Sequence, residues 1–418
     1  MPPATEAAAR AQGPGLPRRV VLCLSASQFI CWGISYYLVG AIGEFIIRDT
    51  GWSRTLVYGG FAGALLVMGG VSGAAGGWVD RWGGRGAMVA GSLLLVAGCV
   101  GIAVAQGVWS YCGAWAVMGL AMRLTLYDAA FATLAHLAGP RARRPMAQVT
   151  LLGGLASTAF WPLGHVLADA LGWRGAVLVY AVLACCTVLL HLGIPRRSAG
   201  LQRAPQVQTV LPAEVGPLAR TAAQRALAGT LFATLTTLVN FLNAGMSAHM
   251  VGLLAGLGLA LPLAVGVASL RGVGQSSARL AEVLWGAQVS PLVLGALASL
   301  LLPAAVLAGL WSGQALAAAW GFALAYGAGN GLLTITRGTL PLVLFDHRSY
   351  GACVGWLVAP GFLLSAGAPV VYAMLIDHAG AAAAMWLSVG VAALAGAAAW
   401  VLWLCFAPRG GRAQAGAG

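Results

Sequence analysis

Long apolar stretches follow one another along most of the chain, with only short polar interruptions between them. About 20 consecutive apolar residues suffice for a helix to cross the roughly 30 Å hydrocarbon core of a bilayer. This pattern predicts an all-α membrane protein. The predicted spans number twelve, at residues 20–47, 55–79, 86–106, 109–136, 146–170, 174–194, 223–253, 257–277, 288–310, 314–337, 350–376 and 380–406.

The longest polar interval between spans, residues 195–222, divides the twelve spans six and six. It is rich in proline, glutamine and arginine, which is typical of a flexible linker. We therefore expect two helical halves and a linker, flanked by short terminal tails; the units are 1–19, 20–194, 195–222, 223–406 and 407–418. A faint direct repeat relates the halves: Pro162 and Asp169-Ala-Leu-Gly172 return as Pro369 and Asp377-His-Ala-Gly380 about 207 positions later.

The placement of arginine predicts the orientation of the spans. All 23 basic residues are arginines, and 19 of them fall in the tails, the linker, alternate loops and the adjoining span ends on one side of the predicted membrane. Basic loops face the cytoplasm in most membrane proteins. We therefore expect a multi-pass protein of the bacterial inner membrane with both termini in the cytoplasm. The arginines of these loops account for the net charge of +13, so no nucleic-acid partner is expected.

The composition excludes several functions. Apolar residues make up 60% and charged residues 8% of the chain, which excludes a soluble enzyme, a disordered chain and a disulfide scaffold. Because lysine is absent, the chain has neither a Walker A loop nor a Schiff-base amine. Its eight cysteines and six histidines lack metal-binding or catalytic spacing. The protein is not expected to be an enzyme, and neither cofactor nor metal is expected.

Polar residues are concentrated in the first, fourth, seventh and tenth spans. Such side chains are costly in hydrocarbon and usually face a bundle interior or a watery cavity. The pattern predicts a central cavity between these four spans. The candidate substrate-binding residues are Gln28, Tyr36, Arg123, Tyr127, Asn240, Asn243, Tyr326 and Asn330.

Charged residues within the spans leave two interpretations open. A guanidinium deep in the membrane costs at least about 2.5–3.5 kcal/mol on insertion scales, so Arg123 requires a function or a partner. Its planar donors would suit a carboxylate or phosphate of a substrate; alternatively, Arg123 pairs internally with Asp128. Asp128 is accordingly either a proton carrier or a fixed ion-pair partner. Arg271, in the inner part of the eighth span, either snorkels toward the interface or adds a second positive charge to the cavity.

The loop after the second span carries a family resemblance. Gly76-Gly77-Trp78-Val79-Asp80-Arg81-Trp82-Gly83-Gly84-Arg85 is similar to the Gly-x-x-x-Asp-Arg-x-Gly-Arg-Arg signature of the major facilitator superfamily, except that Gly86 replaces the last basic residue. The equivalent loop of the second half keeps Gly274 and Arg279 but has Ala278 at the acidic position. The resemblance implies a cytoplasmic gate formed by Gly76, Asp80, Arg81, Gly83, Arg85 and Arg279.

The resemblance also implies a fold and a function. The fold would be that of the superfamily, with two pseudo-symmetric six-helix halves that rock in alternating access. Gly153-Gly154 and Trp161-Pro162-Leu163-Gly164 resemble the fifth span of bacterial monocarboxylate-porter-like members. We expect a monomeric symporter or antiporter in the lipid bilayer whose partners are a small organic anion, such as a monocarboxylate, and a coupling proton. Proton-coupled efflux of amphipathic drug-like compounds is the alternative transport function, and a membrane sensor or scaffold is the alternative of another class.

Overall fold

The computed structural model describes residues 16–138, 143–195, 218–285, 289–345 and 350–407. Almost all of these residues are helical and none forms a strand, which confirms the all-α prediction. The helices are α2 (Arg18–Cys31), the π-helical turn η1 (Trp32–Tyr36), α3 (Leu38–Thr50), α4 (Arg54–Gly70), α5 (Ser72–Ala103), α6 (Val108–Thr125), α7 (Tyr127–Ala138), α8 (Arg143–Gly154), α9 (Ala156–Leu192), α10 (Ala222–Gly256), α11 (Leu261–Trp285), α12 (Pro291–Gly309), α13 (Leu316–Leu344) and α14 (Tyr350–Phe406).

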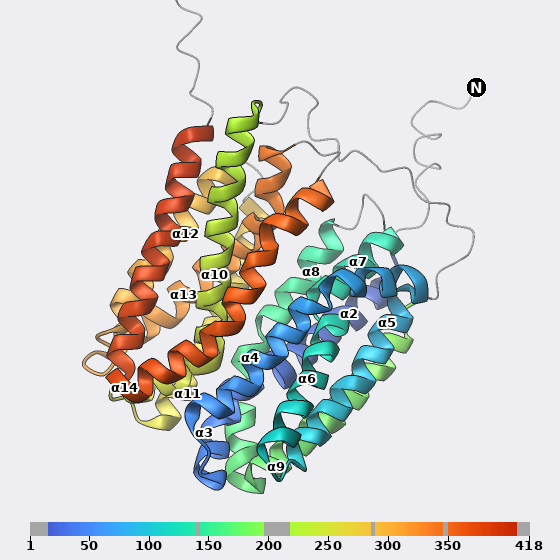
Figure 1. The fold of residues 1–418 in the computed structure, drawn as a ribbon, viewed down its shortest axis with the longest axis vertical. Helices are drawn as coiled ribbons and strands as arrows, with labels where there is room; N and C mark the ends of the chain where they lie inside the picture. Colours follow the sequence, from blue (N-terminus) through green and yellow to red (C-terminus); the bar gives the residue numbers. More distant parts are fainter. Residues whose placement is uncertain (1–15, 139–142, 196–217, 286–288, 346–349, 408–418) are drawn as a thin grey trace, which may run out of the picture.

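Glycines mark the points inside α5, α9 and α14 where the chain reverses its direction. Gly83 in α5, Gly172 in α9 and Gly380 in α14 have φ values of 72°, 70° and 82°, where a side chain is strongly disfavoured and glycine is not. Figure 1 shows the consequence for α14, whose two legs run in opposite directions. Gly83 and Gly172 fall between two predicted spans, and Gly380 is the first residue of the predicted last span. The positions of the turns therefore agree with the span boundaries predicted from hydropathy.

Seven helical stretches of the described residues are long and apolar enough to cross a membrane on their own. They are Arg18–Thr50, Gly83–Ala103, Val108–Leu134, Pro145–Leu192, Ala222–Gly256, Pro291–Gly309 and Leu363–Phe406. Some of these stretches contain more than one predicted span. The multi-pass character is thus supported, whereas the count of twelve spans stays a prediction.

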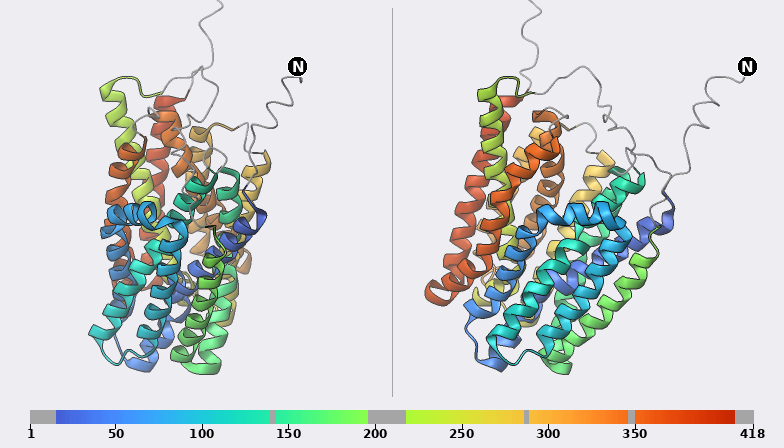
Figure 2. Two further views of the ribbon diagram at one scale, coloured as in Figure 1. Left: turned by 90° about the vertical axis from the view of Figure 1, so that its right-hand side faces the viewer. Right: turned by 45° about the vertical axis from the view of Figure 1, so that its right-hand side comes forward.

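The helices form two groups that lie side by side (Figure 1). Helices α2 to α9 make up the first group and α10 to α14 the second, and the right-hand view in Figure 2 shows the same separation. Apolar side chains from both groups contribute to one large buried cluster. The chain segment between the groups contains the predicted linker, whose residues 196–217 lie outside the described part.

The two groups are in contact at the end opposite the linker, and a cavity lies between them near the linker. At the end opposite the linker, Arg54 of α4 forms an ion pair with Asp377 of α14, 2.9 Å apart. Midway, the Thr158 hydroxyl donates to the carbonyl of Ser269 at 2.7 Å. Near the linker, a cavity of about 1290 Å³ lies between α2, α7 and α8 of the first group and α11 of the second. The molecule is therefore closed at the end opposite the linker.

Candidate functional site

Arg271 of α11 is the centre of the candidate site. Its side chain is completely buried, and its Nη1 donates to Ser247 Oγ at 3.0 Å while its Nη2 donates to Asn243 Oδ1 at 2.5 Å. Within the described part of the chain, no carboxylate lies within ion-pair distance of this guanidinium. A buried positive charge is thus held by two neutral acceptors.

Three aromatic rings surround the same guanidinium. Its carbon lies 5.8 Å from the ring centre of Tyr37, 5.9 Å from that of Trp161 and 5.3 Å from that of Tyr326, within the range of cation–π attraction. Tyr37 and Trp161 belong to the first helix group and Tyr326 to the second. The site therefore lies at the boundary between the groups.

Asn243 connects Arg271 to other predicted site residues. Its side-chain oxygen also accepts from Asn330 Nδ2 at 3.0 Å, and its Nδ2 donates to Tyr36 Oη at 3.4 Å. The structure thus brings together Tyr36, Asn243, Tyr326 and Asn330, four of the eight predicted substrate-binding residues, each from a span in which polar residues are concentrated.

A π-helical turn positions the first-group side of the site. Between Trp32 and Tyr36 the helix widens, and the N–H of Tyr37 still bonds to the carbonyl of Trp32 at 3.1 Å. Such turns are frequent at functional sites because they shift the side chains that follow. Both Tyr36 and Tyr37 are buried here. A Cβ on Gly33 would overlap the Phe160 ring, so glycine permits the close packing of this turn against α9.

Buried hydrogen-bond donors without a partner gather around Arg271. They are Arg271 Nε, Trp161 Nε1 and Trp32 Nε1; the Trp32 ring lies 4.9 Å from that of Tyr36. A buried donor left unpaired costs roughly 1–3 kcal/mol. Indole and guanidinium nitrogens cannot accept a hydrogen bond. The site is consequently complementary to a molecule that supplies acceptors, such as a carboxylate.

Arg123 lies outside this cluster and has its own partner. Its Nη1 is 2.8 Å from Asp128 Oδ2, which matches the internal-pair alternative of the sequence analysis. Asp128 is five residues on, about 500° around an ideal helix. The extended backbone at Leu126 (ψ −171°) separates α6 from α7, so the pair does not depend on ideal helical spacing. A substrate role for Arg123 and a proton-carrying role for Asp128 stay predictions.

Tyr127 and Arg279 meet at a single backbone carbonyl. Tyr127 Oη and Arg279 Nη1 both donate to Thr150 O of α8, at 3.4 and 2.8 Å. The Tyr127 ring also packs against Trp32 with ring centres 4.9 Å apart. Arg279 is almost completely buried and comes from α11, so this contact joins the two helix groups between the central site and the linker end.

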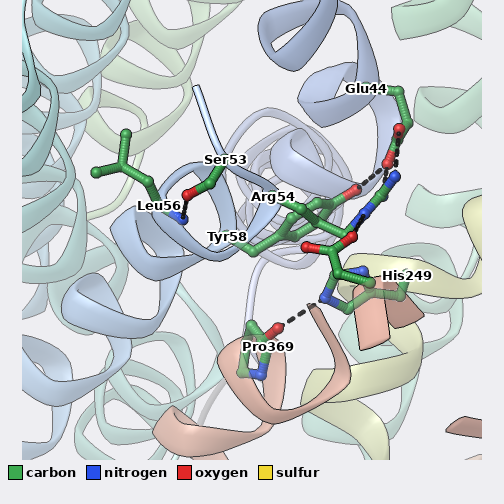
Figure 3. Close-up of polar contacts among 8 residues, drawn as sticks. Glu44, Ser53, Arg54, Leu56, Tyr58, His249 and Pro369 are labelled. Carbon is green, nitrogen blue, oxygen red and sulfur yellow. Dashed lines mark hydrogen bonds and ion pairs between the residues drawn. The ribbon is translucent and has the colours of Figure 1, made fainter. Parts of the chain in front are cut away.

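A second polar cluster lies at the closed end and is shown in Figure 3. Glu44 of α3 forms an ion pair with Arg54 of α4 and accepts a hydrogen bond from Tyr58 Oη at 3.1 Å. The Tyr58 ring packs against His249 of α10, with ring centres 3.8 Å apart. The sequence analysis missed this cluster, although Arg54 and Asp377 could have been noticed as charged residues bordering spans.

Comparisons with known proteins agree with this arrangement. The family model of the Major Facilitator Superfamily matches residues 24–366, most of the chain. The chain belongs to the major facilitator superfamily. The family resemblance of the loop after the second span is thereby confirmed, and the protein is a membrane transporter and not an enzyme.

Two solved superfamily structures have a similar fold. One is a D-xylose-proton symporter, with a TM-score of 0.71 and 13% identity over 92% of this chain and 97% of that one. The other is a bacterial homolog to the human lysosomal transporter Spinster, in an inward-facing and occupied conformation, with a TM-score of 0.65 and 14% identity over 93% and 97% of the two chains. At these identities the likeness concerns the fold. No curated protein matches the chain.

The other predicted site residues of this superfamily member lie apart from Arg271. Gln28 Nε2 donates to the carbonyl of Thr125 at 2.6 Å, at the end of α6. Asn240 accepts from Arg337 Nη1 at 3.5 Å. These contacts connect helices without reaching the aromatic rings around Arg271.

The predicted gate of the superfamily signature is only partly within the described residues. Gly83 supplies the reversal of α5, Arg85 is half-buried, and Arg279 crosses between the helix groups. The side chains of Asp80 and Arg81, and the surroundings of Gly76, lie outside the described part. The gating role of these residues stays a prediction.

Proposed function

We propose that the protein transports a small organic anion, with a carboxylate bound at Arg271. The observation that carries this proposal is a fully buried guanidinium, between the two helix groups, that has no carboxylate partner among the described residues. An unpaired charge buried in a protein is strongly unfavourable, so an anion that enters the site gains both charge compensation and hydrogen bonds.

The surrounding charges support the same class of substrate. Arg279 and Arg337 also lie on helices of the second group, and the ion pairs of the described residues include neither of them. Asp128, the one carboxylate predicted to face the cavity, already pairs with Arg123. A positively charged interior attracts anions. The rings of Tyr37, Trp161 and Tyr326 would cover the apolar part of the bound molecule.

Binding at a boundary between two helix groups fits alternating access. The closed end and the cavity near the linker correspond to a state open toward the linker, which we place in the cytoplasm of a bacterial cell. We propose that transport is coupled to protons, with Asp128 as one candidate carrier; a structural neighbour is named a proton symporter. Efflux of cationic amphipathic compounds is disfavoured, because such a cation would meet Arg271 without a carboxylate beside it.

Binding of organic acids to the purified transporter tests the proposal. We expect a panel containing lactate, benzoate and oxalate to raise the thermal stability of the protein, and cationic dyes to leave it unchanged. For the best acid, Arg271→Gln should weaken binding by about 2–5 kcal/mol, since the desolvated charge is lost. Arg271→Lys keeps the charge but not the planar donors, so part of the affinity should remain.

Arg225→Gln is the matched control, because Arg225 is exposed and its guanidinium donates to the carbonyl of Arg220 away from the site. Its affinity for the same acid should equal that of the unchanged protein. Full acid binding by well-folded Arg271→Gln would overturn the proposal, as would stabilisation by the cationic dyes alone.

A further inference from the structure

The cavity near the linker is lined mainly by apolar side chains. Leucines from three helices contribute: Leu22 of α2 is 69% exposed, Leu152 of α8 is 37% exposed and Leu280 of α11 is 47% exposed. Exposed leucines are unfavourable against water and favourable against hydrocarbon. The cavity is therefore suited to a molecule with an apolar part that covers these side chains.

The depth of the cavity matches one leaflet of a bilayer. Its lining follows α8 from Pro145, near the linker end, to Leu155 just beyond the end of that helix. At 1.5 Å per residue this stretch is about 15 Å long. The hydrocarbon core is about 30 Å thick, so each leaflet contributes about half of that length. An acyl chain from the leaflet at the linker end has the matching reach.

A positive charge lies at the mouth of the cavity, where the headgroup of such a lipid would be. Arg18, the first residue of α2, lines the cavity and is exposed, and the ion pairs of the described residues do not include it. Gln148 of α8 and Ser277 of α11 add exposed polar side chains to the lining. The described residues that line the cavity include no carboxylate. A guanidinium with no acidic neighbour in the lining is complementary to a phosphate.

The cavity does not include the central site. Arg271 and Arg279 are on α11 as well, but neither of them lines the cavity. Helices α8 and α11 touch at its base, where Ser276 Oγ donates to the carbonyl of Leu151 at 2.8 Å. A molecule bound in the cavity would therefore not contact Arg271.

We propose that the cavity binds an anionic phospholipid, with an acyl chain between α2, α8 and α11 and the phosphate at Arg18. A water-soluble anion would leave the leucines uncovered. A zwitterionic lipid carries an additional cation, which the basic linker end repels, whereas a net negative headgroup is attracted. This inference goes beyond the proposed transport of an organic anion and does not depend on it.

Native mass spectrometry of the purified protein counts the lipids that it binds. The protein in detergent is titrated with dioleoyl phosphatidylglycerol and, separately, with dioleoyl phosphatidylcholine, which has the same acyl chains. We expect the first phosphatidylglycerol to bind at an about three- to tenfold lower concentration than the first phosphatidylcholine. Phosphatidylglycerol should also raise the unfolding temperature more, because a ligand of the folded state stabilises it.

Two variants address the two parts of the site. Arg18→Gln should weaken the binding of phosphatidylglycerol to the level of phosphatidylcholine. Ser277→Trp fills the cavity and should weaken the binding of both lipids about tenfold. Arg225→Gln is the control for the charge and Leu263→Trp the control for the added ring, because both positions are exposed and lie outside the cavity lining. Both controls should bind the lipids like the unchanged protein.

Several results would overturn the proposal. Equal binding of the two lipids by the unchanged protein, or unchanged phosphatidylglycerol binding by Arg18→Gln, would exclude a headgroup site at Arg18. Undiminished binding by Ser277→Trp would place the lipid on another surface. Pairs of protein chains that Ser277→Trp abolishes would assign the cavity to a second copy of the chain.

Failure of the proposed function would look different from failure of the lipid site. Arg271→Gln should keep its binding of phosphatidylglycerol, because Arg271 does not line the cavity. A protein that binds phosphatidylglycerol through Arg18 but binds no organic acid would contradict the proposed function alone. A protein that binds organic acids through Arg271 but does not distinguish the two lipids would contradict the lipid site alone.

Discussion

Two arginines within apolar stretches illustrate how one residue type serves two purposes in this transporter. Arg123 has a carboxylate 2.8 Å away, so its charge is compensated inside the protein. Among the described residues, Arg271 has neutral acceptors and aromatic faces around it and no carboxylate, so we propose that its charge binds a ligand. The difference lies in the neighbours that the fold supplies, and it decides which arginine we assign to substrate binding.

The Arg123–Asp128 pair makes a prediction for single and double variants. Arg123→Gln or Asp128→Asn alone leaves one charge without its partner, which for a buried pair costs about 3–5 kcal/mol and somewhat less here because Asp128 is partly exposed. Each single variant should therefore lower the thermal stability or the transport rate of reconstituted protein. The double variant should recover much of the loss, because neither charge remains.

If Arg123 serves only to pair with Asp128, the double variant should bind organic acids with nearly the affinity of the unchanged protein. A double variant that folds well but binds no organic acid would return Arg123 to the substrate site.

The unpaired indole N–H of Trp161 gives a second prediction. Trp161→Phe keeps an aromatic ring near Arg271 but removes the donor, so acid affinity should fall about two- to tenfold, the usual range for one hydrogen bond. Trp115→Phe is the matched control, because the Trp115 N–H is also buried without a partner while its ring packs against Phe61 and Tyr111. Equal losses in both variants, measured by calorimetric titration, would argue against a donor role for Trp161.

At the scale of the helices, hydropathy predicted where spans occur but could not predict the irregular turns inside them. The predicted first span contains η1, and the predicted fourth span contains the break at Leu126. Periodicity is averaged over many residues and is insensitive to one extra residue in a turn. For this reason the sequence predicts Tyr36 for the site but not Tyr37, which directly follows the π-helical turn.

A close helix contact across the groups gives the third prediction. A Cβ on Gly40 of α3 would overlap the carbonyl oxygen of Ser247 on α10, so Gly40→Ala should hinder closure while each helix group stays folded. Overpacking of this kind costs about 1–3 kcal/mol. Spin labels on Gln106→Cys and Gln314→Cys, exposed positions of opposite helix groups, measure closure in a protein without its native cysteines. The population with a long distance between the two labels should rise about tenfold.

Gly63→Ala controls for the added methyl group, because nothing lies within 4 Å of its Cβ position. If both variants change the distance equally, the contact between α3 and α10 does not limit closure.

At the scale of the molecule, the polar spans predicted a shared interior, and the structure brings Tyr36, Asn243, Tyr326 and Asn330 together there. The cluster at the closed end escaped prediction for a physical reason. Arg54 and Asp377 are separated by 323 positions, and their contact joins α4 of one helix group to α14 of the other. A sequence pattern records which residues are polar, but not which conformational state pairs them.

The last prediction concerns the orientation of the whole molecule, on which the direction of the proton depends. Positive loops predict that the 195–222 linker is cytoplasmic; Ser198 belongs to its undescribed part. In intact cells expressing a protein without native cysteines, Ser198→Cys should resist a membrane-impermeant maleimide, and Gln106→Cys at the opposite end should react. Permeabilised cells should label at both positions, which controls for expression. The reverse pattern in intact cells would invert the protein, and the cavity near the linker would then face the outside of the cell.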